Sequence, residues 1–107
     1  MSNSADNNDV VILAAARTPQ GRLNGQLASF TAVELGAHAI RAALAASGVK
    51  AEQVDSVIMG QVLQAGAGQN PARQSAIGAG IGWNVPTVTI NKVCLSGLTA
   101  VIDAARM

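Results

Sequence analysis

Short β-branched apolar runs alternate along this chain with stretches that have helical periodicity, and this order is what most constrains the fold. The runs lie within residues 10–15, 54–63 and 86–90, and the helical stretches at 31–47, 70–80 and from Leu95 or Ser96 onward. Parallel strands need long crossover connections, which are usually helices. The β-α-β-α-β-α order therefore predicts an α/β fold with an open, mostly parallel sheet.

The first run, residues 10–15, is continuously apolar, as expected for a strand that is buried on both faces. Thr18-Pro19 ends it, because the residue before a proline avoids helical geometry. Residues 1–9 are rich in Ser, Asn and Asp, and we predict a disordered, solvated tail that lacks the features of a signal peptide. At the edge of a sheet, an apolar strand of this kind would promote association. We therefore expect the isolated polypeptide to be marginally stable or insoluble.

Two predicted helices have recognisable start signals. Thr31 and Glu34 have the spacing of a capping box, and Gly48 is a natural stop for the helix that follows. The apolar stripe of this helix consists of Val33, Ala37, Ile40 and Leu44. Asn70-Pro71 predicts the next helix start, with Asn as the cap and Pro at the first helical position. The last helix is predicted to be still running at Met107, so we expect a chain that continues beyond it.

The composition excludes several classes of function. Half of the 107 residues are apolar and 12% are charged, while the only aromatic residues are one Trp and one Phe. A net charge of +1, without a basic stripe, argues against nucleic acid and membrane surfaces as partners. The single cysteine rules out an intrachain disulfide and fits a reducing, cytoplasmic location.

Cys94 is the candidate catalytic residue, because it lies between the predicted third strand and the last helix. Open α/β sheets place ligands outside the carboxyl ends of their strands. A thiolate is a strong nucleophile, and the positive end of a helix stabilises it. The unpaired N–H groups of a helix start can also bind an oxyanion. The alternative from the residues alone is a buried structural cysteine that acts as a small apolar residue.

Several motifs in order resemble the thiolase family. The sequence around the cysteine, Asn91-Lys92-Val93-Cys94-Leu95-Ser96-Gly97-Leu98, resembles the nucleophile motif of thiolases. The other similar stretches are Ala16-Arg17-Thr18-Pro19, Glu34-Leu35-Gly36, Gly60-Gln61-Val62-Leu63 and the segment from Gly66 to Gln74. Together they cover residues 10–107, which we interpret as part of a thiolase N-terminal domain.

The resemblance implies an acetyl-CoA C-acetyltransferase, which reversibly joins two acetyl-CoA molecules into acetoacetyl-CoA and CoA. Cys94 would be the nucleophile that carries the acyl group as a thioester. Acetyl-CoA or 3-ketoacyl-CoA would be the substrate, and no metal or bound cofactor is expected. The family also implies a homo-oligomer, a dimer or tetramer, with an interface near Gln69, Asn70 and Arg73.

The same family uses a histidine and a second cysteine from later parts of its chains to move protons. Here His38 is the only histidine, and we interpret it as a surface or packing residue of the first helix beside Glu34. We therefore expect the 107 residues alone to be inactive. Two alternatives stay open: a non-catalytic thiolase remnant that at most pairs with full-length partners, and a ketoacyl synthase relative. The Arg-Thr-Pro and Gly-Gln-Asn-Pro-Ala-Arg stretches weigh against the latter.

Overall fold

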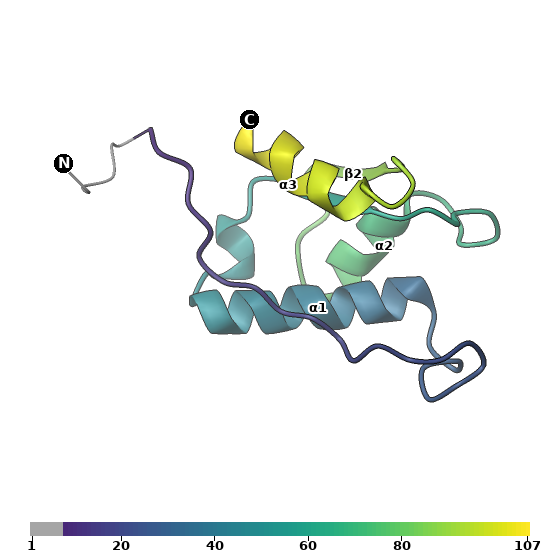
Figure 1. Ribbon diagram of the computed structural model, residues 1–107. Coiled ribbons are helices and arrows are strands. Elements are labelled where there is room, and N and C mark those ends of the chain that lie inside the picture. The colour runs from purple at the N-terminus through teal and green to yellow at the C-terminus, as the bar shows by residue number, and fades with distance from the viewer. Residues whose placement is uncertain (1–7) are drawn as a thin grey trace, which may run out of the picture.

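The computed structural model describes residues 8–107. Its elements, in chain order, are α1 (Ala32–Ser47), a short 3-10 helix η1 (Ala51–Gln53), β1 (Val57–Gly60), α2 (Pro71–Gly78), β2 (Thr87–Ile90) and α3 (Ser96–Ala105). In Figure 1, α1 and α3 lie on opposite sides of the molecule, with α2 and the strands between them. None of the described helices is both long and apolar enough to cross a membrane.

The sheet positions everything else. Strands β1 and β2 pair in parallel, with Val57 opposite Thr87 and Gly60 opposite Ile90. Side chains of a strand alternate between its two faces. Val57 and Met59 point to the side of α2 and α1, where they pack with Ala76. Gly60 contacts the start of α3 on the other side. Helices thus cover both faces, which confirms the predicted α/β class with a parallel sheet.

The core is small and is built from small side chains. It centres on Val57, Ala76, Ile81 and Val85, and Ile40 and Leu44 of the predicted α1 stripe pack against it. Helices α1 and α2 approach closely through glycine. A Cβ added at Gly36 would stand 2.6 Å from Ser75 Oγ. With glycine there, Ser75 Oγ donates a hydrogen bond to the Val33 carbonyl at 3.0 Å. Glycine at this position therefore allows the two helices to pack closely.

The helix ends follow the local signals in the sequence. Thr31 Oγ1 accepts a hydrogen bond from the Glu34 N–H at 3.1 Å, which is the predicted cap, although no return bond from the Glu34 side chain to Thr31 is found in the described chain. Gly48 ends α1 in the left-handed conformation, at φ 73°. Asn70 caps α2 and Pro71 is its first residue, as predicted.

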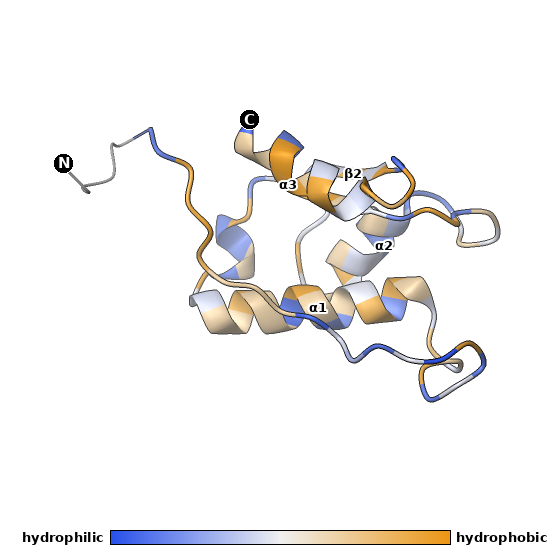
Figure 2. Ribbon diagram, in the orientation of Figure 1, coloured by the Kyte–Doolittle hydropathy of each residue, from blue (hydrophilic) through white to orange (hydrophobic). Residues whose placement is uncertain are grey.

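The first predicted strand is wrong. Residues 10–13 form no ladder with β1 or β2, and Val10 and Ile12 are 67% and 79% exposed. Figure 2 shows this segment as an apolar stretch running outside the helices. A strand requires a neighbour with free N–H and C=O groups and layers that cover its faces. Within residues 8–107 the segment pairs with neither strand and its side chains stay exposed, so its burial preference is not met.

Two boundaries also differ from the sequence prediction. Helix α2 ends at Gly78 rather than near Gly80, because Gly80 adopts a left-handed φ of 90°. Helix α3 ends at Ala105, whereas the pattern predicted a helix still running at Met107. Most of the predicted tail at residues 1–9 lies outside the described residues.

Candidate active site

Cys94 lies on the turn that joins β2 to α3, as the sequence predicted. The strand ends at Ile90 and the helix begins at Ser96, so five residues make the connection. The cysteine is free and exposed, which contradicts the alternative of a buried structural cysteine. An accessible thiol at a helix start can act as a nucleophile.

The residue before the cysteine has an unusual backbone. Val93 has φ 49°, in the left-handed region that a β-branched residue rarely adopts. Asn91 Oδ1 accepts a hydrogen bond from the Val93 N–H at 2.9 Å, and Asn91 Nδ2 donates to the Val62 carbonyl at 3.1 Å. One asparagine thus holds the turn and ties it to the segment after β1.

Ser96 closes the turn from the other side. Its hydroxyl accepts a hydrogen bond from the Lys92 N–H at 2.8 Å and donates one to the Val93 carbonyl at 2.6 Å. The side chain is only 4% exposed, so water does not compete for these bonds. Both backbone polar groups of Val93 are therefore held by side chains.

The start of α3 is pressed against the end of β1 and open on its other side. A Cβ at Gly60 would stand 2.4 Å from the carbonyl carbon of Ser96, so only glycine permits this approach. A Cβ at Gly97 would meet no atom within 4 Å. The helix start thus has open space at Gly97, three residues after Cys94.

Donors for an oxyanion are available in the same place. No acceptor within residues 8–107 takes a hydrogen bond from the N–H of Cys94 or Gly97. Unpaired N–H groups at a helix start, beside a nucleophile, stabilise negative charge that develops on an attacked carbonyl oxygen. The turn thus combines a thiol, free donors and open space.

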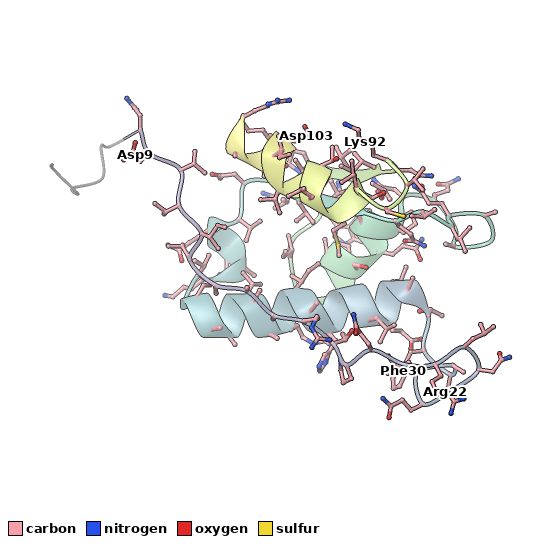
Figure 3. All side chains as sticks on the ribbon, viewed as in Figure 1. Asp9, Arg22, Phe30, Lys92 and Asp103 are labelled. Atoms are coloured by element: carbon pink, nitrogen blue, oxygen red, sulfur yellow. The ribbon has the colours of Figure 1, made fainter. Side chains whose placement is uncertain are left out.

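Within residues 8–107, no acidic or basic side chain is hydrogen-bonded to this thiol. The only histidine, His38, is exposed on α1, as the sequence predicted. Among the basic residues, Arg17 and Arg73 donate to the carbonyls of Thr18 and Trp83. Figure 3 shows Lys92 in the part of the molecule that holds α3, whereas Arg22 lies on the loop before α1. The basic side chains therefore do not form one patch around the thiol.

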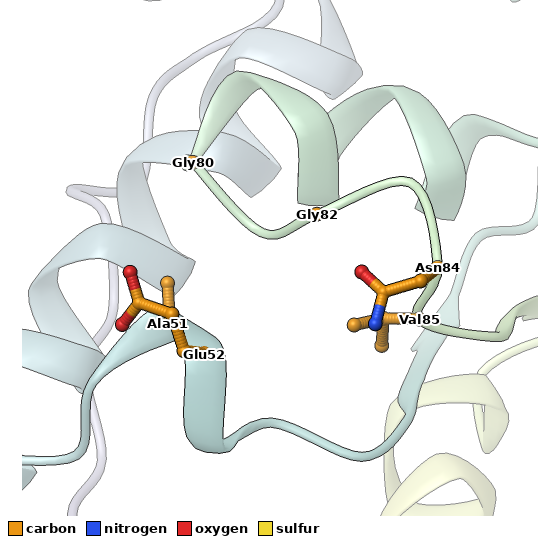
Figure 4. Close-up of a pocket in the computed structure, with 6 residues that line it drawn as sticks. All are labelled: Ala51, Glu52, Gly80, Gly82, Asn84 and Val85. Carbon is orange, nitrogen blue, oxygen red and sulfur yellow. The ribbon is translucent and has the colours of Figure 1, made fainter.

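Two hollows in the described chain lie elsewhere. One of about 240 Å³ is bordered by η1 and the loop after α2, with Glu52 and Asn84 on its rim. In Figure 4 the Asn84 amide points into it, and the Glu52 carboxylate is turned away. The other, of about 530 Å³, lies between the start of α1 and the loop after β1. Neither is lined by Cys94, whose side chain is exposed.

Asn70 does more than cap α2. Its amide donates to the Thr87 carbonyl at 3.1 Å, and its Oδ1 accepts a 2.6 Å hydrogen bond from Thr89 Oγ1. This link between α2 and β2 could not be predicted from a local pattern, because it joins residues 17 and 19 positions apart. The roles of Asn91 and Ser96 were also missed. An Asn two residues before a strained position is a recognised turn signal that could have indicated the former.

Comparison with known proteins identifies the family. Residues 10–107 match the family model described as "Thiolase, N-terminal domain". The chain is 64% identical over 98 residues to an acetyl-CoA acetyltransferase of Cupriavidus necator, covering 92% of this chain and 25% of that protein.

It is also 63% identical over 97 residues to a probable acetyl-CoA acetyltransferase of Mycobacterium tuberculosis, covering 91% of this chain and 25% of that protein. The mitochondrial acetyl-CoA acetyltransferase B of Xenopus laevis is 52% identical over 99 residues, which are 92% of this chain and 24% of the relative. The chain thus spans about a quarter of the length of these relatives. Because the family model matches nearly its whole length, the chain belongs to the thiolase family.

Proposed function

We propose that this protein is an acetyl-CoA C-acetyltransferase of the thiolase type, with Cys94 as its acyl carrier. The observation that carries the proposal is the exposed thiol at the open start of α3, within a chain whose relatives bear that enzyme name. A thiol in this position has the access and the nearby donors that acyl transfer requires.

In the first half-reaction, the Cys94 thiolate attacks the carbonyl carbon of acetyl-CoA. A new bond forms between Cys94 Sγ and that carbon, while the bond to the CoA sulfur breaks. CoA leaves as a thiolate and takes up the proton that the Cys94 thiol lost when it ionised. The N–H of Cys94, which no acceptor within residues 8–107 takes, is the proposed donor to the carbonyl oxygen as it becomes negative. In the second half-reaction, the α-carbon of another acetyl-CoA, after losing a proton, attacks the acyl-thioester. Acetoacetyl-CoA is released, and the Cys94 thiolate is restored.

The proton transfers need groups other than those at the turn. Cys94 is the only cysteine and His38 the only histidine of the 107 residues, and His38 is exposed on α1. General acid–base help commonly contributes on the order of 10²–10⁴ in rate. We therefore propose that the 107 residues alone do not turn over. CoA thioesters serve as substrates, without a bound metal or cofactor, in a cytoplasmic homo-oligomer.

Residues near α2 are the proposed site of oligomer contact. Gln69 is exposed and Arg73 is partly exposed, whereas the amide of Asn70 is already engaged with Thr87 and Thr89. Gln69 is therefore better placed than Asn70 to contact a second subunit, whereas Arg73 is itself bonded to the Trp83 carbonyl at 3.2 Å. Arg73 also lies over the ring of the exposed Trp83, with its Cζ 5.9 Å from the ring centroid, which adds an aromatic surface to this region.

The test uses the complete gene product and acetyl-CoA without a second acceptor. Mass spectrometry of the peptide that contains Cys94 should show the mass of one added acetyl group, and Cys94→Ala should lose it while staying folded. Modification of a different residue, or none in the wild-type protein, would refute the assignment. A native product of only these residues that binds a longer thiolase but is never acylated would instead support the non-catalytic alternative.

A further inference from the structure

We propose that Asn91 is a positioning residue, which fixes the direction of the Cys94 thiol by holding Val93 in its left-handed conformation. This proposal rests on the proposed function, since it concerns how the acyl carrier meets its substrate. Asn91 itself need not touch the substrate. It acts through the backbone of the residue that directly precedes the cysteine.

The first step is that Val93 needs a restraint. At φ 49°, a β-branched side chain crowds the backbone, and such residues persist only where their surroundings determine them. Val93 is 65% exposed, so packing contributes little to holding it. Hydrogen bonds to its backbone are the remaining restraint among the described contacts.

The second step is that the restraint has two sides. The Val93 N–H donates to Asn91 Oδ1 at 2.9 Å, while its carbonyl accepts from the Ser96 hydroxyl at 2.6 Å and from the Ser96 N–H at 3.1 Å. Without the Asn91 bond, Val93 could relax to a negative φ. Such a rotation would swing the following residue, Cys94, away from its present direction.

The third step is that Asn91 is anchored outside the turn. Its Nδ2 donates to the carbonyl of Val62, two residues beyond the end of β1. The neighbouring Gln61 N–H donates to the Ile90 carbonyl at 3.0 Å, so the two chain segments run together up to this point. The amide of Asn91 thereby fixes the position of the cysteine turn relative to both strands of the sheet.

The exposure of Asn91 makes it possible to distinguish a positioning role from a purely structural one. Asn91 is exposed, and hydrogen bonds that water can replace contribute little to the free energy of unfolding. Loss of its side chain should therefore leave the melting temperature almost unchanged. The buried Ser96 is a poorer probe, because its replacement would also affect stability.

The experiment uses the complete gene product and two reagents for the Cys94 thiol. Acetylation by acetyl-CoA requires a thiolate that is oriented toward the bound acyl group, whereas alkylation by iodoacetamide requires only an accessible thiolate. Asn91→Ala should slow acetylation about tenfold or more, because small misplacements of a reacting group are costly. Its alkylation rate should stay within about twofold of wild type, since access to the thiol is unchanged. Asn91→Asp keeps the acceptor for Val93 but loses the donor to Val62. Its acetylation rate should lie between those of Asn91→Ala and the wild type.

A second variant makes the test specific for the backbone of Val93. Glycine adopts a left-handed conformation without steric cost, so the double variant Asn91→Ala, Val93→Gly should recover part of the acetylation rate. Asn84→Ala, which removes another exposed asparagine, is the matched control and should acetylate like wild type.

Three results would overturn the proposal: wild-type acetylation in Asn91→Ala, an equal loss with both reagents, or no recovery in the double variant. Those results leave Cys94 as the acyl carrier. A wild-type protein that iodoacetamide alkylates at Cys94 but acetyl-CoA does not acetylate would overturn the proposed function and this inference together.

Discussion

Gly60, the last residue of β1, is in direct contact with the backbone of Ser96, the first residue of α3. A Cβ at Gly60 would lie 2.4 Å from the Ser96 carbonyl carbon and 2.6 Å from the Gly97 nitrogen. Both are backbone atoms, so no side-chain rotation could relieve the overlap. The position of the cysteine turn therefore depends on a residue 34 positions earlier in the chain.

Gly60→Ala should push the start of α3 away from the sheet. We expect a loss of about 1–3 kcal/mol in the free energy of unfolding, as for other overpacked sites. Acetylation of Cys94 should slow as well, because the turn moves with the helix. The denaturation midpoint and the acetylation rate measure the two effects. An alanine variant with wild-type values for both would show that the backbone gap is wider than described.

Gly97→Ala should have the opposite effect on stability. Its Cβ would meet nothing within 4 Å, and alanine in a helix is favoured over glycine by about 0.5–1 kcal/mol. We nevertheless expect slower acetylation, because the methyl group would occupy the open space beside Cys94. Thermal melting and acetylation kinetics on the same sample test this. A faster or unchanged reaction would mean that the substrate does not approach over Gly97.

Gly36→Ala should destabilise the contact between α1 and α2 by about 1–3 kcal/mol. The new Cβ would stand 2.6 Å from Ser75 Oγ, in a buried contact. Ser75→Ala removes that oxygen, so the double variant should be less destabilised than the sum of the two single variants, with a coupling of about 0.5–3 kcal/mol. Denaturant titration of all four proteins completes the cycle. Strict additivity would contradict the described contact.

The isolated polypeptide of residues 1–107 should associate as its concentration rises. Val11 and Leu13 are 61% and 66% exposed on an extended segment with unpaired backbone groups, and Leu98 and Val101 of α3 are also exposed. Light scattering or sedimentation measures the association. A Val11→Lys, Leu13→Lys variant should remain monomeric to higher concentration, since charge on such a segment opposes pairing. A wild-type monomer with one cooperative thermal transition would contradict this expectation.

Local features of the fold were predictable from the sequence because their signals are local. Gly48 and Asn70 mark helix ends through their own backbone and side-chain preferences, and the strands at Val57 and Thr87 follow from β-branched residues. The strand predicted at residues 10–15 was wrong for a physical reason. An apolar pattern indicates which residues would gain from burial, but not whether they become buried. Within residues 8–107 this run pairs with neither strand and stays exposed.

The candidate site was predictable in part. The position of Cys94 between a strand and a helix follows from the pattern on either side, and the structure confirms it. The left-handed Val93 and the contact between Gly60 and Ser96 could not be predicted in this way. Both depend on how β1 and α3 meet in space, which no short stretch of sequence encodes.

The placement of the single tryptophan has a consequence for optical spectroscopy. Trp83 is 74% exposed beside Arg73, and the chain has no tyrosine, so almost all of its near-ultraviolet signal comes from one ring in contact with water. Intrinsic fluorescence should shift little when the core around Val57 and Ala76 melts. It would report instead on the loop after α2, and a partner that covers this ring would change the emission of a protein whose fold had not changed at all.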